Sequence, residues 1–441
     1  MAVRSENKPL RVAICGGGPA GLGAAIALSK LPDIQISVFE QARELREIGA
    51  GIRIGYNCWR VLELLGAADG VKGHHKVSVV HRRNALTGEV VGSAGPSKVP
   101  LKYHPRRVRR TRLQKALISK VPPGIIKLNK HVSSIEDLGQ DGVRIVFRDG
   151  TETTADLVVG ADGIRSTIRD SIFPEHKIKF TGTTIFRVLI PQHTIAHIPD
   201  LTAATQWWHG PAGHVYHSLV DDPSEVPEQE RLFEIAARTV VDPETDAGPK
   251  FSWGIPATNE KVESQFKDYD PRIREMLAQV PEGQWKEFSA FAGPRLETLT
   301  GWDKVVLLGD ASHPLSGAFG SGAAFALEDG WILARAIEHA RAAGQPLATA
   351  LEIFDAIRSP YYLKMYQHLD DQKRKMEEAK AANPDATFTS SLKERVYAFG
   401  NEESLPWVYY NNIEDVWQSF LKGQIKSSSL SSSVPQVVAS L

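Results

Sequence analysis

The chain has 441 residues, of which 42% are hydrophobic and 24% are charged. This balance is typical of a globular protein and excludes a largely disordered or membrane-embedded chain. Lys plus Arg and Asp plus Glu number 52 each, so no net charge favours binding to nucleic acid or to an anionic membrane, and we expect a small molecule as the partner.

The chain contains two cysteines, Cys15 and Cys58, which are too few for a disulfide framework or a clustered metal site. We therefore expect no metal. There is no uninterrupted apolar run of about 18 residues, and the N-terminal residues lack an apolar core of signal-peptide length. These features favour a reducing, cytoplasmic location with no stable membrane association. They leave the oligomeric state open, and a homodimer is the assembly we consider first.

Residues 10–40 predict a strand, a helix and a second strand. Residues 10–15 form a short apolar run that ends in glycines, and Ala and Leu recur at helical spacing over residues 19–31. A second apolar run ends at Glu40. Such a βαβ unit has parallel strands. The next segment, residues 46–55, is punctuated by glycine and is expected to pass close to a ligand.

The middle of the chain predicts a change of architecture. Residues 143–147 and 155–159 read as two strands joined by Arg148-Asp149-Gly150, and Asp-Gly favours a tight hairpin before Gly160. From residue 181 to about 292, short runs separated by Pro, Asp and Gly predict a mainly antiparallel second domain, inserted in the first.

The chain is then expected to return to its first domain. Residues 304–308 read as a buried strand and residues 322–340 as a long apolar helix. Residues 352–380 predict one or two amphipathic helices with a break near Pro360. The Ser-rich residues 427–433 have little to bury and predict a frayed tail.

A glycine motif, Gly16-x-Gly18-x-x-Gly21, sits between the first strand and the first helix. The first glycine permits a tight turn, the second admits a pyrophosphate, and the third allows close helix packing. Glu40 places a carboxylate where the ribose hydroxyls of an adenosine would lie, which favours an unphosphorylated ribose. The structural alternative is a glycine-rich turn without a ligand. The motif alone does not separate NAD from FAD.

Two later segments each place an aspartate at a strand end: Gly160-Ala161-Asp162-Gly163 and Leu308-Gly309-Asp310. With the glycine motif, and in this order, they resemble the glycine fingerprint, the DG motif and the GD motif of the class A flavoprotein monooxygenases. The chain resembles the salicylate hydroxylase and hydroxybenzoate hydroxylase group, particularly its fungal branch, over residues 10–358. After the GD motif the family often has Pro-x-x-Gly-Gln-Gly-Ala-Asn, whereas residues 317–324 read GAFGSGAA.

The resemblance implies FAD as the bound cofactor, with NADH or NADPH as a transient co-substrate and O2 as the oxidant. It implies that Asp310 bonds the ribityl chain and that Asp162 serves both FAD and the nicotinamide. Helix capping is the structural alternative for both aspartates. The residues predicted to bind the cofactor are Gly16, Gly18, Ala20, Gly21, Glu40, Gly51, Ile52, Arg110, Gln114, Asp162, Asp310, Gly320, Gly322 and Ala323.

The same resemblance implies the fold. It is an α/β fold with a Rossmann-like FAD-binding domain of the hydroxybenzoate hydroxylase type, an inserted, mainly antiparallel β substrate domain and C-terminal helices. The expected parts are the first FAD-binding segment (1–180), the substrate domain (181–292), the second FAD-binding segment (293–352), a helical region (353–426) and a flexible tail (427–441).

The substrate-binding residues are predicted from the second domain. Arg187 matches a position where the family often has an Arg beside the substrate, and an ion pair at the domain junction is the alternative. His214 and Tyr216 share one face of a strand, while His217 points to the other. A His could act as a base near neutral pH, and a Tyr could donate to an oxyanion. We predict Arg187, His214 and Tyr216 as catalytic, with a structural role as the alternative for each.

The function implied by the resemblance is hydroxylation of a small phenol or phenolic acid, with or without decarboxylation, through a flavin C4a-hydroperoxide. One alternative is a flavin-dependent epoxidase or a dearomatising hydroxylase of a secondary metabolite. Another is a non-catalytic flavin-binding protein. Trp207-Trp208 does not reproduce the Trp-x-Trp-x-Ile-Pro pattern of flavin halogenases, which counts against halogenation.

Overall fold

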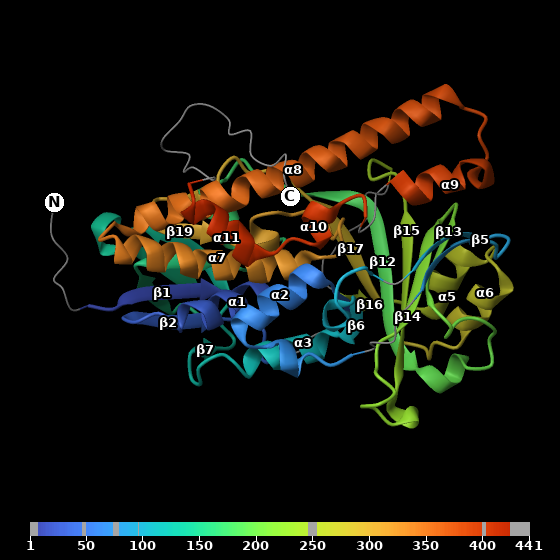
Figure 1. Ribbon diagram of the computed structural model, residues 1–441, viewed down its shortest axis with the longest axis horizontal. Helices are drawn as coiled ribbons and strands as arrows, with labels where there is room; N and C mark the ends of the chain where they lie inside the picture. The colour runs from blue at the N-terminus through green and yellow to red at the C-terminus, as the bar shows by residue number, and fades with distance from the viewer. Residues whose placement is uncertain are drawn as a thin grey trace.

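The computed structural model describes residues 8–45, 50–73, 79–95, 97–245, 254–398 and 403–423, so the predicted tail lies outside the described residues. Two bodies stand side by side, one built on a six-stranded sheet and the other on an eight-stranded sheet (Figure 1). Each has its own cluster of buried apolar side chains. The predicted α/β fold with a second, mainly antiparallel part is confirmed.

The six-stranded sheet contains the predicted βαβ unit. Its strand β1 pairs in parallel with β2 and β11, and β11 pairs in parallel with β19. In spatial order the strands are β18 (Thr300–Gly301), β19 (Val305–Leu307), β11 (Leu157–Gly160), β1 (Leu10–Cys15), β2 (Ile34–Phe39) and β7 (Ile126–Lys127). The helices of this body are α1 (Pro19–Leu28), α2 (Tyr56–Leu65), α3 (Arg110–Ile118), α4 (Thr167–Ile172) and α7 (Gly322–Ala342).

The predicted hairpin is correct at its turn and wrong in its second strand. β9 (Val143–Phe147) turns at Gly150, where φ is 79°, and pairs with β10 (Glu152–Ala155). β11 lies instead in the six-stranded sheet, parallel to β1. Between β10 and β11, the carboxylate of Asp156 accepts hydrogen bonds from the backbone N and Nη2 of Arg11, at 2.9 and 2.8 Å. This contact fixes the point where the chain changes sheets.

Two small sheets complete the first body. β9 and β10 are joined by β8 (Val132–Asp137) in a three-stranded antiparallel sheet. β3 (Gly51–Ile54) pairs with β6 (Arg106–Arg109). β3 covers the described part of the glycine-punctuated segment, of which residues 46–49 lie outside the described residues.

The eight-stranded sheet has one face on its own core and one face toward the first body. Apolar side chains of the central strands, such as Phe186, Trp208 and Phe233, pack with α5 (Asn259–Glu263) and α6 (Pro271–Ala278). In spatial order the strands are β16 (Ile255–Pro256), β17 (Lys286–Ala292), β12 (Lys179–Pro191), β15 (Leu232–Val240), β14 (Gly213–Leu219), β13 (Thr205–Gly210), β4 (Val80–Asn84) and β5 (Val90–Ala94). β4 and β5 come from far earlier in the chain, and the sequence did not indicate that they join this sheet.

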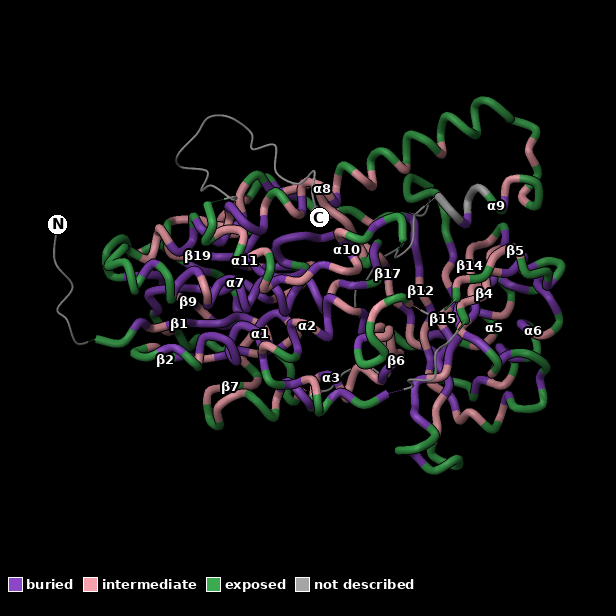
Figure 2. The backbone as a smooth tube through the Cα atoms, in the orientation of Figure 1, coloured by how far each residue is buried: buried purple, intermediate pink, exposed green. Residues whose placement is uncertain are grey.

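α8 (Leu347–Ala382) is one continuous helix, so the break predicted near Pro360 is wrong. Proline removes one backbone hydrogen bond from a helix. Phe354 before it and Tyr362 and Met365 after it are buried, and this packing on both sides holds the two halves in line. The far half of α8 is exposed (Figure 2). The helices that follow are α9 (Phe388–Ala398), α10 (Pro406–Tyr409) and α11 (Ile413–Leu421).

None of the helices in the described ranges combines the length and apolar character needed to cross a bilayer.

α1 and α7 lie unusually close together because glycines line their contact. A Cβ at Gly23 would lie 2.8 Å from Cδ2 of Leu327, and a Cβ at Gly330 would lie 2.5 Å from the backbone N of Ala24. α1 follows the carboxyl end of β1, and α7 follows that of β19, which runs parallel to β1 in the same sheet, so the two packed helices run in the same direction. Their N-terminal ends therefore lie at the same edge of the six-stranded sheet.

We expect Gly330→Ala to lower the stability of the protein, because the added methyl group would meet the backbone of α1. Overpacking a tight contact typically costs about 1–3 kcal/mol. Thermal or urea unfolding measures the change. Gly95→Ala is the control, since its Cβ would meet no atom within 4 Å. Equal stability of the two variants would show that the glycine contact is not a packing constraint.

Candidate active site

The three glycines of the motif have distinct surroundings at the start of α1. Gly16 has a φ of 118°, and a Cβ there would lie 2.2 Å from the carbonyl oxygen of Ala161. A Cβ at Gly21 would lie 1.9 Å from the carbonyl oxygen of Gly16. A Cβ at Gly18 would meet no atom within 4 Å. Two glycines therefore allow close packing, while the third borders open space, as a pyrophosphate site requires.

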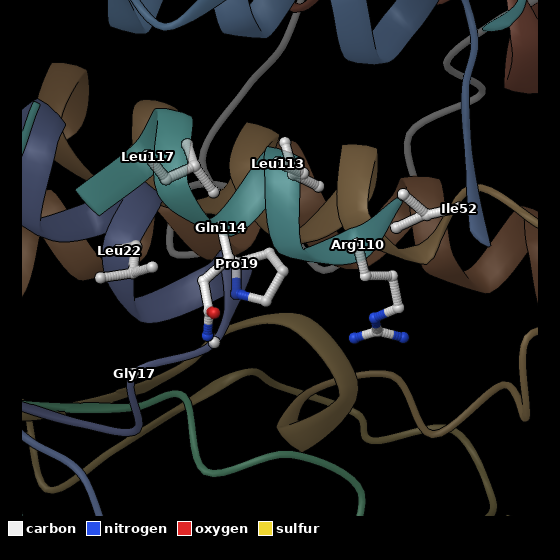
Figure 3. A pocket seen from close by; sticks show the side chains of 9 residues that line it. Gly17, Pro19, Leu22, Ile52, Arg110, Leu113, Gln114 and Leu117 are labelled. Atoms are coloured by element: carbon white, nitrogen blue, oxygen red, sulfur yellow. The ribbon is translucent and has the colours of Figure 1, made fainter. Parts of the chain in front are cut away.

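A pocket lies over this turn and joins residues that are distant in the sequence (Figure 3). Arg110 and Gln114 extend into it from α3, and Ile52 reaches it from β3. The structure thus brings together four of the predicted cofactor-binding residues, including Gly18. The lining residues are Gly17, Gly18, Pro19, Leu22, Ile52, Arg110, Leu113, Gln114 and Leu117.

Glu40 lies beside the glycine turn at the end of β2. Its carboxylate accepts hydrogen bonds from the backbone N of Gly17 at 2.7 Å and from that of Ala42 at 2.8 Å. The side chain is half-buried. The carboxylate is thus held at the position expected for an adenosine ribose, although contact with the ribose stays a prediction.

Asp310 and the N-terminal end of α7 face each other. The Asp310 side chain is exposed and has no hydrogen-bond partner within the residues that the structure describes. Its Oδ1 is 3.9 Å from the Cβ position of Gly322, the first residue of α7. Gly320 has a φ of 61° and borders open space. The first turn of α7 has no acidic residue, so its positive end and one unpaired carboxylate are both presented to a ligand.

Ala20 and Ala323 lie in the first turns of α1 and α7, whose backbone N–H groups have no partner within the helix. The two parallel helices thus present two groups of amide donors side by side. An open glycine turn, an unpaired carboxylate and two positive helix ends fit the phosphates, hydroxyl groups and electron-rich ring of FAD. Within the described ranges, no group of three or more His, Cys, Asp or Glu side chains could hold a metal ion.

Two predicted cofactor residues have partners within the protein. Asp162 accepts hydrogen bonds from Oγ of Ser166 at 2.5 Å and from the backbone N of Thr167 at 2.7 Å, so it caps the start of α4. Burial raises the pKa of its carboxyl group, and these hydrogen bonds oppose that rise. The backbone N of Gly51 donates to Glu234 at 2.9 Å, which joins β3 to the eight-stranded sheet. A contact of Asp162 or Gly51 with FAD remains a prediction.

A buried polar network, which the sequence analysis missed, holds the Asp310 loop in place. Asp329 of α7 accepts a hydrogen bond from the backbone N of Gly309 at 2.8 Å. It also accepts from Nε of Arg358 at 2.7 Å and from the hydroxyl of Tyr362 at 2.6 Å, both on α8. His313 stacks on Tyr362, with ring centroids 4.1 Å apart. The signal in the sequence was an acidic pair, Glu328-Asp329, inside the otherwise apolar first half of the long helix.

Glu328, next to Asp329, belongs to the same network. Nη2 of Arg358 donates to it at 3.2 Å, and Nδ2 of Asn411 donates at 3.0 Å. Burial raises the pKa of Glu328 to about 7, although Arg358 and Asn411 favour the charged form. The carboxyl group therefore titrates near neutral pH within the folded protein.

The predicted substrate residues meet on the face of the eight-stranded sheet that is turned toward the first body. Across the strands, Trp207 pairs with Tyr216, Tyr216 with Ala236, and Ala236 with Arg187. Paired residues share a face, so these side chains form one row with the small Ala236 in its middle. The rings of Trp207 and Tyr216 are 4.6 Å apart. His214 lies on the same face, two residues from Tyr216, as predicted.

Arginines of the first body lie against this row. Nε of Arg107 donates to Glu234 at 2.7 Å, and its guanidinium lies 4.7 Å from the centre of the Tyr216 ring. Arg187 has no hydrogen bond or ion pair within the described part of the chain, and its guanidinium is 5.9 Å from the centre of the Phe288 ring. Burial lowers the pKa of Arg187, as do Arg107 and Arg110, while Glu234 opposes this.

Burial affects the two histidines of β14, which lie on opposite faces of the sheet. Burial lowers the pKa of His214 well below its usual value, and Arg238 lowers it further. This shift favours the neutral form of His214, and its role as a base stays a prediction. His217 lies on the core face, as predicted, and its Nε2 accepts a hydrogen bond from Nε1 of Trp208 at 3.0 Å. Burial lowers the pKa of His217 to about 3, so it is structural.

Comparison with known proteins gives a consistent result. Residues 9–367 match a family described as the FAD binding domain. The chain is similar to a 3-amino-4-hydroxybenzoate 2-monooxygenase of Streptomyces platensis, with 28% identity over 365 residues, or 81% of this chain and 85% of the relative. It is also similar to a salicylate hydroxylase of Pseudomonas putida, with 27% identity over 387 residues, or 83% of this chain and 86% of the relative.

A solved structure of a salicylate hydroxylase substrate complex has a TM-score of 0.72 to this chain at 22% sequence identity. It covers 93% of this chain and 98% of that chain, so the two share a fold. The narrower assignment to a fungal branch stays a prediction, because relatives come from Streptomyces and Pseudomonas as well as from Hypocrea jecorina.

We expect Asp310→Ala to weaken the binding of FAD, because it removes the unpaired carboxylate that faces the start of α7. A hydrogen bond to a charged group contributes about 1.5–3 kcal/mol, which corresponds to a loss of affinity of about 10- to 100-fold. Titration of flavin-free protein with FAD measures it. Asp268→Ala, a surface change in the second body, is the control. An Asp310→Ala protein with unchanged FAD affinity would contradict the assignment.

The raised pKa of Glu328 predicts a stability that depends on pH. Between about pH 4.5 and 7 the folded protein holds a proton on Glu328 that the unfolded chain releases, so the contribution of Glu328 to stability is greatest below this window and falls as the pH rises through it. Glu328→Gln should flatten that decline in unfolding experiments from pH 4.5 to 8. Glu338→Gln, on the exposed side of the same helix, should leave it unchanged. If stability falls with pH equally in Glu328→Gln and in the wild-type protein, Glu328 is not the cause of the fall.

Proposed function

The chain belongs to the FAD binding domain family, and on this premise we propose that it is a FAD-dependent monooxygenase that hydroxylates a phenolic acid with NADH or NADPH and O2. The observation that carries the proposal is Arg187, a half-buried guanidinium without an acidic partner in the described part of the chain. It shares a row with aromatic side chains, next to the cofactor pocket. The names of relatives such as salicylate hydroxylase and 3-amino-4-hydroxybenzoate 2-monooxygenase support an aromatic acid as the substrate.

The two sites adjoin through β3 and through β6 with α3. Ile52 lines the cofactor pocket, and its neighbour Gly51 donates to Glu234 in the eight-stranded sheet. Arg110 lines the same pocket, while Arg107 lies over Tyr216. A ring bound against the Tyr216 row would therefore lie beside the cofactor, as transfer between them requires.

When bound, FAD supplies the redox chemistry, which is acceptance of hydride from the nicotinamide and transfer of one oxygen atom from O2 to the ring. Gly18, Asp310 and the amides at the start of α7 would hold it. The positive end of α7 stabilises negative charge on a group bound there. No residue of this chain needs to carry electrons.

The protein's own contribution to the reaction is charge and position. Arg187, with Arg107 and Arg110 nearby, provides a positive potential that holds a carboxylate and favours the ionised form of a phenol. Ionisation raises the electron density of the ring. His214 is neutral and can accept or donate one hydrogen bond. Trp207 and Tyr216 provide an aromatic surface against which the ring stacks.

The alternatives use the same scaffold. An epoxidase acts on a carbon–carbon double bond and needs no phenolate, so the unpaired cation of Arg187 favours a phenol over an alkene. Analysis of the product separates aromatic from dearomatising hydroxylation. A non-catalytic flavin-binding protein would bind FAD without substrate-stimulated oxidation of NAD(P)H. Measuring that stimulation separates the enzyme from the binding protein.

We also propose a cytoplasmic location and a homodimer. The first is supported by Cys15 and Cys58, which are both free and buried thiols. The homodimer is tested by measuring the molar mass in solution with size-exclusion chromatography and light scattering.

We expect Arg187→Gln to raise the KM for a phenolic acid about 10- to 100-fold, because it removes a charge-assisted hydrogen bond worth about 1.5–3 kcal/mol. FAD content should not change. The assay is substrate-dependent oxidation of NADH or NADPH coupled to product, over salicylate, hydroxybenzoates and simple phenols. Arg144→Gln, on a surface strand of the first body, is the control. If no phenolic compound stimulates oxidation by the wild-type protein, the proposed function is wrong.

A further inference from the structure

A second arginine, Arg238, lies on the same face of the sheet as Arg187. Arg238 pairs with His214 and with Ile185, and Ala236, two residues before it, pairs with Arg187. Arg187 and Arg238 are therefore diagonal neighbours on adjacent strands, with Cα atoms about 7–8 Å apart. Nothing in the local sequence of Arg238 separates it from a surface residue, so the sequence did not point to it.

Arg238 is held in place but its charge is not neutralised. Its Nη2 donates to Oγ1 of Thr183 at 3.1 Å. Its Nε is buried without a hydrogen-bond partner, and no carboxylate pairs with it in the described ranges. Burial lowers the pKa of Arg238. Proteins rarely keep a buried charge without a counter-charge, and an exception of this kind indicates a ligand.

Among the described residues, no negative charge shifts the pKa of Arg238, whose change comes from burial alone. Its neighbours His209 and His214 are both kept neutral, since burial lowers the pKa of His209 to about 4 and that of His214 well below its usual value. Nε2 of His209 is also buried without a partner in the described part of the chain. The acid of this face, Glu234, already accepts hydrogen bonds from Arg107 and Gly51.

The two unpaired guanidiniums point to different ends of the same surface. Arg187 interacts electrostatically with Arg107, Arg110 and Glu234, at the end of the sheet near β3 and β6. Arg238 extends to Thr183, near the opposite end of β12. The aromatic row of Trp207 and Tyr216 lies beside both. A benzene ring with acidic groups on opposite sides can direct one group toward each guanidinium.

We propose that Arg238, with His214 and Thr183, binds a second acidic group of the substrate, at the end of the ring away from Arg187. The substrate class is then a phenol with two carboxylates, or with one carboxylate and another anionic group. This inference rests on the proposed function and deepens it. Arg238 is a specificity-determining residue, while the hydroxylation itself does not depend on it.

The test uses the FAD-loaded protein and three related acids. Salicylate and 3-hydroxybenzoate each carry one carboxylate, and 2-hydroxyterephthalate carries both, on opposite sides of its ring. Titration of each against the flavin absorption spectrum gives its Kd. The wild-type protein should bind 2-hydroxyterephthalate at least about 10-fold more tightly than either monoacid, because a charge-assisted pair contributes about this factor. Arg238→Gln should remove this preference, and Arg144→Gln should keep it.

The outcomes separate this inference from the proposed function. Hydroxylation of a monoacid, with no preference for the diacid or with a preference that survives in Arg238→Gln, overturns the inference and leaves the function intact. A wild-type protein that binds and oxidises none of the acids overturns both. If Arg238→Gln loses FAD, Thr183→Val replaces it, since it removes the hydroxyl that orients the guanidinium. An unchanged preference in that variant overturns the inference as well.

Discussion

The parallel contact between α1 and α7 is the constraint on which the rest of the structure depends. Gly23 and Gly330 remove the side chains that would otherwise separate the two helices. Because each helix follows a strand of the same parallel sheet, both begin at the carboxyl edge of that sheet. The unpaired amides of two helix ends are thereby directed into one region, where both can face the same dinucleotide.

Two polar contacts connect the paired helices to the rest of the site. The Asp329 network fixes Gly309 and so sets the position of the next residue, Asp310, relative to the start of α7. Glu234 joins β3 and Arg107 to the eight-stranded sheet. The cofactor pocket and the substrate face therefore lie next to each other. Chemistry that needs a flavin and an aromatic ring in contact follows from this adjacency, and the arginines of the face select for acids.

The sequence predicted what depends on short-range pattern. The glycine turn, the strand ends at Glu40 and Asp310, and the alternation of His214 and His217 all follow from local spacing. It could not predict what depends on contacts between distant segments. β4 and β5 join a sheet formed mostly much later in the chain. The helix across Pro360, the Asp329 network and Arg238 depend on neighbours that only the folded chain supplies.

The central claim is that one FAD lies across the paired ends of α1 and α7 and faces the Tyr216 row. A crystal structure of the protein with FAD bound tests it most directly. The account predicts the pyrophosphate beside the open side of Gly18, the ribityl chain at Asp310, and the ring system between Gly322 and the eight-stranded sheet. A flavin bound elsewhere, without contact to Gly18 and Asp310, would contradict the account.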